Sequence, residues 1–172
     1  MTRALPLLFV SALIAASAVA QEPRLSPHEQ TSITIAGKKI TIEYGRPYVK
    51  GRKIFGGLEP LGKVWRTGAD EATTLTTEAD LTIGSLKVPK GTYGLFTLPE
   101  ASRWTLIVNT VAKQWGAFSY DQKKDLGRTE MKLSQGPKTE QFTITLEPQG
   151  SNGAVLKMAW DTTVATAAFT AH

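Results

Sequence analysis

The stretch Ser32-Ile-Thr-Ile-Ala-Gly-Lys-Lys-Ile-Thr-Ile-Glu-Tyr44 decides the fold class. Two isoleucines before Gly37-Lys38 and two after it alternate with polar residues. Such alternation buries one face of a β-strand and leaves the other in water, and a glycine between two alternating runs permits a tight turn. The stretch therefore predicts a β-hairpin.

The same alternation continues through the rest of the chain. It predicts further strands within residues 73–77, 81–83, 86–88, 92–98, 104–108, 142–146, 156–160 and 164–169, with a tight turn at Gly84-Ser85. Residues 109–133 lack alternation, so we expect a long loop or a short helix there. No stretch shows the long apolar stripe of an amphipathic helix. We therefore predict an all-β fold, an antiparallel β-sandwich or jelly roll of about eight to ten strands.

The first 20 residues have the pattern of a secretory signal peptide. Arg3 precedes an apolar block, and small residues stand at Ala18 and Ala20. The block is too short, and too interrupted by Pro6, to be read as a membrane anchor, so we expect cleavage after Ala20. The protein would then be periplasmic or secreted, with no stable membrane insertion after cleavage.

The remainder of the chain predicts one domain. Residues 21–30 contain two prolines and few apolar groups, so we expect an extended leading segment, with regular structure beginning near Thr31. Residues 31–172 then form a single β domain, because a chain of this length normally folds around one core.

Composition excludes several classes of protein. The 172-residue chain has no cysteine, so disulfides, lipid attachment through cysteine, thiol catalysis and cysteine-ligated metals are excluded. Without Arg3, 19 of the 20 Lys and Arg residues remain against 15 acids, which gives a net charge of +4. These cations are scattered and form no basic stripe, so we expect no nucleic acid among the partners.

Arginines, acids and aromatic residues gather in Tyr44-Gly-Arg-Pro-Tyr-Val-Lys-Gly-Arg52 and in Val64-Trp-Arg-Thr-Gly-Ala-Asp-Glu71. An arginine offers two parallel donors to a carboxylate or phosphate, and its flat face stacks on aromatic rings. One interpretation is a pocket for a small anionic or hydroxyl-rich, sugar-like ligand. The other is a network of internal ion pairs that closes the loops. The candidate residues are Arg46, Arg52, Arg66, Asp70 and Glu71, flanked by Tyr44 and Trp115.

The sequence assigns no catalytic residue. Asp70 and Glu71 are adjacent, and adjacent residues of an extended chain point to opposite faces. A sugar hydrolase would therefore need a distant carboxylate, such as Asp121 or Asp125, to work with one of them. No Gly-x-Ser-x-Gly motif accompanies the serines.

Metal binding and aromatic stacking are weaker signals. The only histidines, His28 and His172, lie near opposite ends of the domain, so we predict no metal site and no cofactor. The segment Trp115-Gly-Ala-Phe-Ser-Tyr120 could stack its rings on a sugar or an arginine, or could be pinned into the core by them.

Several of these motifs together resemble the exported bacterial family named domain of unknown function 2911. They are Arg24-Leu-Ser-Pro-His28, Tyr44-Gly-Arg-Pro47, Lys50-Gly-Arg52 with Ile54-Phe-Gly56, Val64-Trp-Arg-Thr-Gly-Ala69, Gly91-Thr-Tyr93 and Trp115-Gly116. The resemblance implies an exported, β-rich domain without an established activity. This chain has Asp70 where the family pattern commonly has Asn, so a role that needs the amide as a donor would be lost here.

The leading expectation is an exported, non-catalytic domain that binds a small anionic or hydroxyl-rich ligand, or an envelope partner, at its arginine-rich loop end. The alternatives are an envelope carbohydrate hydrolase that uses Asp70 or Glu71, and a structural module with no ligand. Arginine tips that point into an open cleft would favour a site, whereas buried and fully paired tips would favour a structural role.

Overall fold

The computed structural model describes residues 24–172, so the expected signal peptide, residues 1–20, lies outside it. The regular elements of these residues are nine strands and one 3-10 turn. They are β1 (His28–Ile35), β2 (Lys38–Gly45), β3 (Thr74–Thr77), β4 (Leu81–Ile83), β5 (Leu86–Val88), β6 (Gly91–Pro99), β7 (Trp104–Asn109), η1 (Gln122–Lys124), β8 (Asp125–Gln149) and β9 (Gly153–Ala171). The prediction of an all-β fold with eight to ten strands is confirmed.

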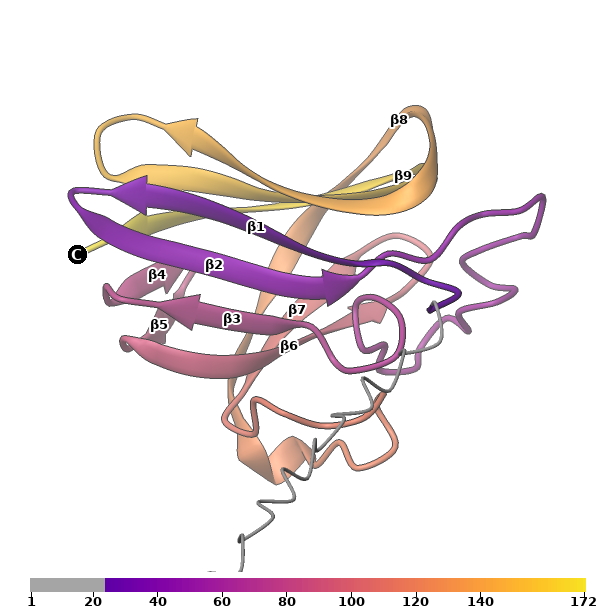
Figure 1. Cartoon of the computed structure of the whole chain (residues 1–172), viewed down its shortest axis with the longest axis horizontal. Helices are drawn as coiled ribbons and strands as arrows, with labels where there is room; N and C mark the ends of the chain where they lie inside the picture. Colours follow the sequence, from indigo (N-terminus) through magenta and orange to yellow (C-terminus); the bar gives the residue numbers. More distant parts are fainter. Residues whose placement is uncertain (1–23) are drawn as a thin grey trace, which may run out of the picture.

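All nine strands belong to one antiparallel sheet with the order β1-β2-β3-β6-β7-β8-β9-β4-β5. The sheet curls over itself, so that β1 and β2 come to lie beside the last part of β8 (Figure 1). Two layers that pack across a core, as in a sandwich, thus arise within a single sheet. No helix of the described chain is long and apolar enough to cross a membrane.

The hairpin that decides the fold class is formed by β1 and β2, in the register that pairs Ile33 with Ile40. Ala36 and Gly37 connect the strands with φ angles of 48° and 75°. Two positive φ angles in succession match the twist of a two-residue hairpin turn, which is why a glycine is favoured there. β1 begins at His28, three residues earlier than expected, so part of the predicted leading segment is a strand.

The prediction of a loop or short helix across residues 109–133 is only partly right. The short η1 is present, but β8 already begins at Asp125 and runs for 25 residues. Register shifts between Gln135 and Thr139, and again before Thr143, bend β8 as bulges do. The first part of β8 is largely exposed or half-exposed, so its hydrophobic pattern is weak and the sequence did not reveal it, whereas the strand predicted within residues 142–146 is the later part of β8.

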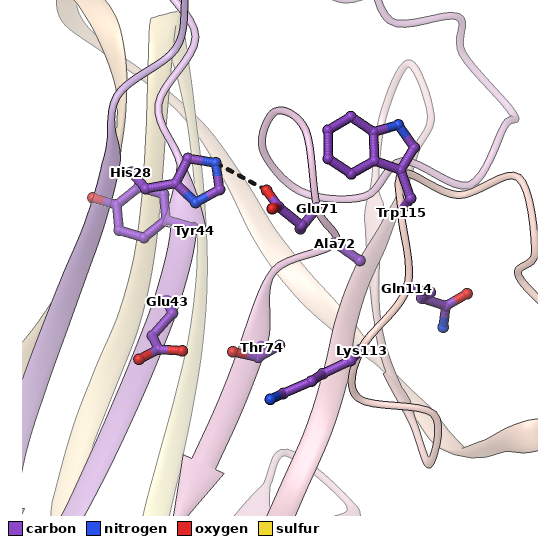
Figure 2. A pocket seen from close by; sticks show the side chains of 9 residues that line it. All are labelled: His28, Glu43, Tyr44, Glu71, Ala72, Thr74, Lys113, Gln114 and Trp115. Atoms are coloured by element: carbon purple, nitrogen blue, oxygen red, sulfur yellow. Dashed lines mark ion pairs between the residues drawn. The ribbon is translucent and has the colours of Figure 1, made fainter. Parts of the chain in front are cut away.

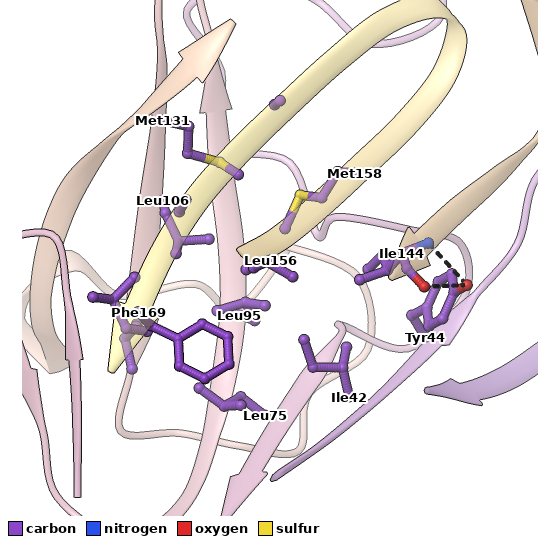
Figure 3. Packing of buried hydrophobic residues seen from close by; sticks show 14 of the residues in the cluster. Ile42, Tyr44, Leu75, Leu95, Leu106, Met131, Ile144, Leu156, Met158 and Phe169 are labelled. Carbon is purple, nitrogen blue, oxygen red and sulfur yellow. Dashed lines mark hydrogen bonds between the residues drawn. The ribbon is translucent and has the colours of Figure 1, made fainter. Parts of the chain in front are cut away.

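The buried side chains of the inner face form one large cluster, to which each of the nine strands contributes residues. Figure 3 shows part of it, with Leu95, Leu106, Leu156 and Phe169 packed together. Tyr44, at the end of β2, closes the cluster on one side: its hydroxyl donates to Ile144 O at 3.3 Å and accepts from Ile144 N at 2.9 Å. These bonds join β2 to β8 without strand pairing.

Residues 46–73, between β2 and β3, carry no regular strand yet are firmly attached to the core. Trp65 exchanges backbone hydrogen bonds with Thr97 of β6, at 2.8 and 3.0 Å, and its ring is buried. Gly45 touches this loop so closely that a Cβ there would lie 2.2 Å from Ala69 O. Only glycine permits this approach, which places the turn around Asp70 directly against the end of β2.

Replacing Tyr44 with Phe should lower the free energy of unfolding by about 1–3 kcal/mol, because the buried Ile144 N–H would lose its acceptor. The matched control is Tyr93→Phe, which removes a hydroxyl that donates to Pro89 O at 2.9 Å near the surface. Denaturant unfolding of both variants measures the difference. Equal losses in the two variants would contradict the closing role of Tyr44.

Candidate functional site

The site is organised by the turn Thr67-Gly-Ala-Asp-Glu71, which we call the acidic turn. Thr67 and Asp70 have positive φ angles of 59° and 63°, and Thr73 N donates to Arg66 O at 3.1 Å across the base of the turn. Gly116 N donates to Asp70 O at 3.0 Å, which ties the turn to the loop that carries Trp115. The turn directs Asp70 and Glu71 towards two different pockets.

The first pocket, which we call the tryptophan pocket, has a volume of about 490 Å³. Glu71 and Trp115 lie on one side of it and Tyr44 and Glu43 of β2 on the other (Figure 2). Lys113 extends along its lower end in this view. Trp115 is 60% exposed, which is unusual for a residue whose ring could bury a large apolar surface. The pocket therefore combines an accessible aromatic face with charged hydrogen-bonding groups.

The second pocket, which we call the arginine pocket, has a volume of about 290 Å³ and lies on the other side of the acidic turn. Lys50, Arg52 and Arg66 line it together with Glu59 and Asp70. Arg52 Nε donates to Val49 O at 3.1 Å, and Arg66 Nε donates to Gly68 O at 3.1 Å.

The positive charges of the arginine pocket are not neutralised by direct ion pairs. Neither Arg52 nor Arg66 pairs with a carboxylate of residues 24–172. Trp160 also lines this pocket, and its buried indole N–H has no hydrogen-bond partner in the described chain. Guanidinium groups without carboxylate partners are the groups that an anion would pair with.

Glu59 is a carboxyl group of the arginine pocket that the sequence did not single out. Burial raises its pKa to about 7, although the charges of Arg66 and Arg52 act in the opposite direction. Near neutral pH the carboxyl is therefore protonated in a large part of the molecules, and it then cancels no arginine charge. Within the sequence Leu-Glu-Pro, nothing distinguishes this glutamate from an ordinary loop residue.

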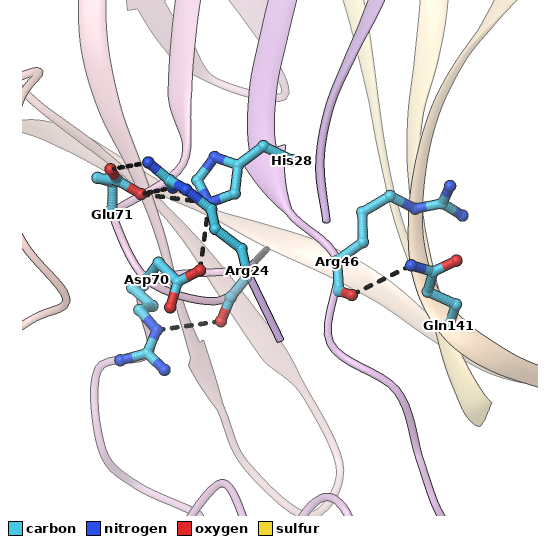
Figure 4. Close-up of polar contacts among 8 residues, drawn as sticks. Arg24, His28, Arg46, Asp70, Glu71 and Gln141 are labelled. Carbon is cyan, nitrogen blue, oxygen red and sulfur yellow. Dashed lines mark hydrogen bonds and ion pairs between the residues drawn. The ribbon is translucent and has the colours of Figure 1, made fainter. Parts of the chain in front are cut away.

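Arg46 belongs to neither pocket. Its guanidinium donates to Phe142 O at 3.0 Å, to Thr143 Oγ1 at 2.8 Å and to the carboxylate of Glu29. Figure 4 shows that its carbonyl oxygen in turn accepts a hydrogen bond from Gln141, at 3.3 Å. Arg46 is thus a clamp between the end of β2 and β8.

The candidate residues therefore divide into three groups. Arg52, Arg66 and Asp70 line the arginine pocket; Tyr44, Glu71 and Trp115 line the tryptophan pocket; Arg46 closes the fold. Tyr44 lines the tryptophan pocket, but it is almost fully buried. Its hydroxyl accepts a hydrogen bond from Ile144 N inside the core and is therefore not free to bind a ligand.

The wall between the pockets carries a polar cluster that the sequence did not predict. Arg24 donates to both carboxylate oxygens of Glu71, at 2.6 and 3.0 Å, and this contact lowers the pKa of Glu71 (Figure 4). His28 Nε2 lies 3.2 Å from Glu71 Oε2 and 3.4 Å from Asp70 Oδ2. The only other histidine, His172, lies elsewhere, beside Thr82. The fold thus brings an imidazole nitrogen of His28 close to carboxylate oxygens of Asp70 and Glu71, more than 40 residues away in the sequence, and all of these atoms can bind a metal ion.

The distant carboxylates considered for a hydrolase lie outside both pockets. Asp125 accepts hydrogen bonds from Asn109, Tyr120 and Arg128, and its side chain is only 8% exposed. Asp121 caps η1 by accepting from Lys123 N at 2.9 Å. Neither carboxylate is available to work with Asp70 or Glu71 on one bond. The carboxylate that shares a pocket with Glu71 is Glu43 of β2.

Rings of the segment 115–120 have different roles. Tyr120 packs on Phe96, with ring centroids 5.1 Å apart, and donates to Asp125. Burial and the contact with Asp125 raise the pKa of Tyr120 to about 12. Phe118 and Trp115 instead face solvent, so only part of the segment is pinned into the fold.

Comparison with known proteins places the chain in a family. Neither the curated proteins nor the solved structures contain a significant match. The sequence pattern of the family described as "Protein of unknown function (DUF2911)" matches residues 26–169, nearly all of the folded domain. That range includes Arg52 and Arg66 of the arginine pocket, the acidic turn and the loop of Trp115. The chain therefore belongs to the DUF2911 family, a family of unknown function.

Proposed function

We propose that this protein is a binding protein for a small anionic ligand, and that the ligand occupies the arginine pocket. The observation that carries the proposal is a partly enclosed pocket whose two arginines, Arg52 and Arg66, form no ion pair within residues 24–172. An anion in this pocket would accept hydrogen bonds from the guanidinium groups that line it.

The arrangement of charges supports an anion over a neutral ligand. Lys50, Arg52 and Arg66 contribute three positive charges, against the carboxylate of Asp70 and Glu59, whose pKa of about 7 leaves it partly protonated near neutral pH. A net positive, partly enclosed pocket concentrates field lines and attracts anions. The volume of about 290 Å³ suits a compact group such as a phosphate ester or a small polycarboxylate.

The tryptophan pocket favours a second candidate, a hydroxyl-rich ligand such as a saccharide. Its accessible Trp115 ring offers an apolar face for stacking, and Glu43 and Glu71 offer acceptors for hydroxyl groups. Gln114, which also lines the pocket, has a buried Oε1 with no hydrogen-bond partner in the described chain. Export to the periplasm or the outside, as the signal peptide suggests, would expose both pockets to soluble ligands and envelope components.

Titration with inorganic phosphate should shift the NMR signal of the Trp160 indole N–H, because Trp160 lines the pocket that the anion would occupy. Arg66→Ala should weaken binding at least about tenfold, since a hydrogen bond to a charged group contributes about 1.5–3 kcal/mol. Arg103→Ala is the matched control, because Arg103 is exposed and pairs with Glu100 away from the pocket.

The same spectra separate the two candidate functions. A neutral sugar such as glucose should shift the indole signal of Trp115 and leave that of Trp160 in place. If phosphate moves neither indole signal, or if Arg66→Ala and Arg103→Ala weaken binding equally, the arginine pocket is not an anion site.

Arg66→Ala should lower the free energy of unfolding by less than Arg46→Ala. Arg46 loses bonds to Phe142 O, Thr143 and Glu29 on truncation, at a cost of about 1.5–3 kcal/mol. Arg66 loses one bond, to Gly68 O, and no ion pair of the described chain. Urea unfolding of the two variants tests the distinction, and a larger loss for Arg66→Ala would make that arginine structural.

Anion affinity should fall as the pH rises from about 6 to 8, because Glu59 ionises with its raised pKa and then competes for the arginines. The loss should be roughly fivefold, since one charge nearby contributes about 1 kcal/mol. Sulfate is the suitable probe because its own charge is constant in this range. Glu59→Gln should abolish the pH dependence, whereas Glu100→Gln, outside the pocket, should preserve it. A dependence that persists in Glu59→Gln would assign it to another group.

A further inference from the structure

We propose that His28, Asp70 and Glu71 form a binding site for a divalent first-row metal cation, with zinc as the best fit, in the wall between the two pockets. The proposal is independent of anion binding in the arginine pocket. One imidazole nitrogen and one oxygen from each carboxylate all lie within 4.8 Å of one another. Imidazole together with carboxylate is a ligand set that zinc accepts.

The distances between these atoms match the edges of a metal coordination polyhedron. His28 Nε2 lies 3.2 Å from Glu71 Oε2 and 3.4 Å from Asp70 Oδ2. With metal–ligand bonds of about 2.0–2.2 Å, neighbouring ligands of a tetrahedral zinc ion lie about 3.3–3.6 Å apart. A cation could therefore bridge His28 and either carboxylate with little movement.

The hydrogen bonds of the cluster leave one acceptor without a donor. Arg24 Nη1 lies 2.7 Å from His28 Nε2 and 2.6 Å from Glu71 Oε2, so it donates to both. If Nε2 accepts from Arg24, it carries no proton and cannot donate to Asp70. Asp70 has no other side-chain partner among residues 24–172. Three acceptor atoms thus converge, and a divalent cation would satisfy all of them together.

Arg24 is the natural competitor of such a cation. Its guanidinium already places a single positive charge against His28 and Glu71 (Figure 4). The side chain of Arg24 is 40% exposed and precedes β1, so it can withdraw without breaking a strand pair. Two carboxylates attract a divalent cation more strongly than a monovalent one at the same place.

The three ligands are held on rigid parts of the fold. His28 begins β1 and is paired with Gly45 of β2. Asp70 and Glu71 lie on the acidic turn, which Gly116 N and the bond from Ala72 N to Gln114 O attach to the Trp115 loop. Preorganised ligands lower the cost of ordering a metal site.

Three protein ligands leave one position of a tetrahedral ion for water or for an oxygen of another molecule. His28 and Glu71 both line the tryptophan pocket, and Figure 2 shows the imidazole directed across it towards Glu71. The free position would therefore be accessible from that pocket.

The test is titration of the full chain, without a histidine tag, with zinc chloride by calorimetry and with cobalt chloride by visible absorption. One equivalent should bind, and the cobalt bands should have the intensity of a low-coordinate site. His28→Ala should weaken binding at least about tenfold, since even outer-shell changes cost 10–100-fold. The matched control is His172→Ala, the other histidine, which should bind as the wild type does.

Arg24→Ala distinguishes a metal site from a simple ion-pair cluster. If Arg24 competes with the cation, its removal should make zinc binding severalfold tighter while the thermal midpoint without metal stays equal or falls slightly. Absence of binding to both the wild type and Arg24→Ala overturns the proposal, as does equal binding by His28→Ala and the wild type. Thermal melts of each variant show that it is folded when the titration is made.

Discussion

The stacking of Trp65 on Trp160 is the contact on which the rest of the structure depends. The two rings are 5.7 Å apart and nearly parallel, at 13°. Trp160 belongs to β9, whereas Trp65 comes from the long connection between β2 and β3, so the contact makes that connection part of the core. It also fixes the indole of Trp160 in an orientation in which its N–H faces no protein acceptor of residues 24–172. The packing of the core thus determines the chemistry of the arginine pocket.

Local sequence pattern predicted much of the fold because most strands bury one face completely. The hairpin around Gly37 and the turn at Gly84 followed from alternation and glycine alone. The start of β8 could not be predicted, because Asp125 and the residues after it remain half-exposed and carry little periodic signal. β9 was expected as two strands; it continues through Asp161, whose positive φ of 52° bends the strand without ending it.

The site was predicted in composition but not in geometry. Arginine and acid content alone grouped Arg46 with Arg66, yet one clamps β2 to β8 and the other lines a pocket. That difference depends on β8 lying beside the end of β2, which is a long-range contact with no local signal. Glu59 and His28 were not predicted as site residues for the same reason. Burial in the folded chain raises the pKa of Glu59, and only the fold brings His28 close to Asp70 and Glu71.

The acidic turn has a thermodynamic consequence. Asp70 and Glu71 are successive residues on one backbone segment, and each forms part of the wall of a different pocket. An occupant that displaced the turn on one side would displace it on the other, and the two binding free energies would then be linked. Linkage requires the effect to be reciprocal, with each occupant changing the affinity of the other by the same factor. Any coupling between occupants of the two pockets would therefore report movement of this one turn.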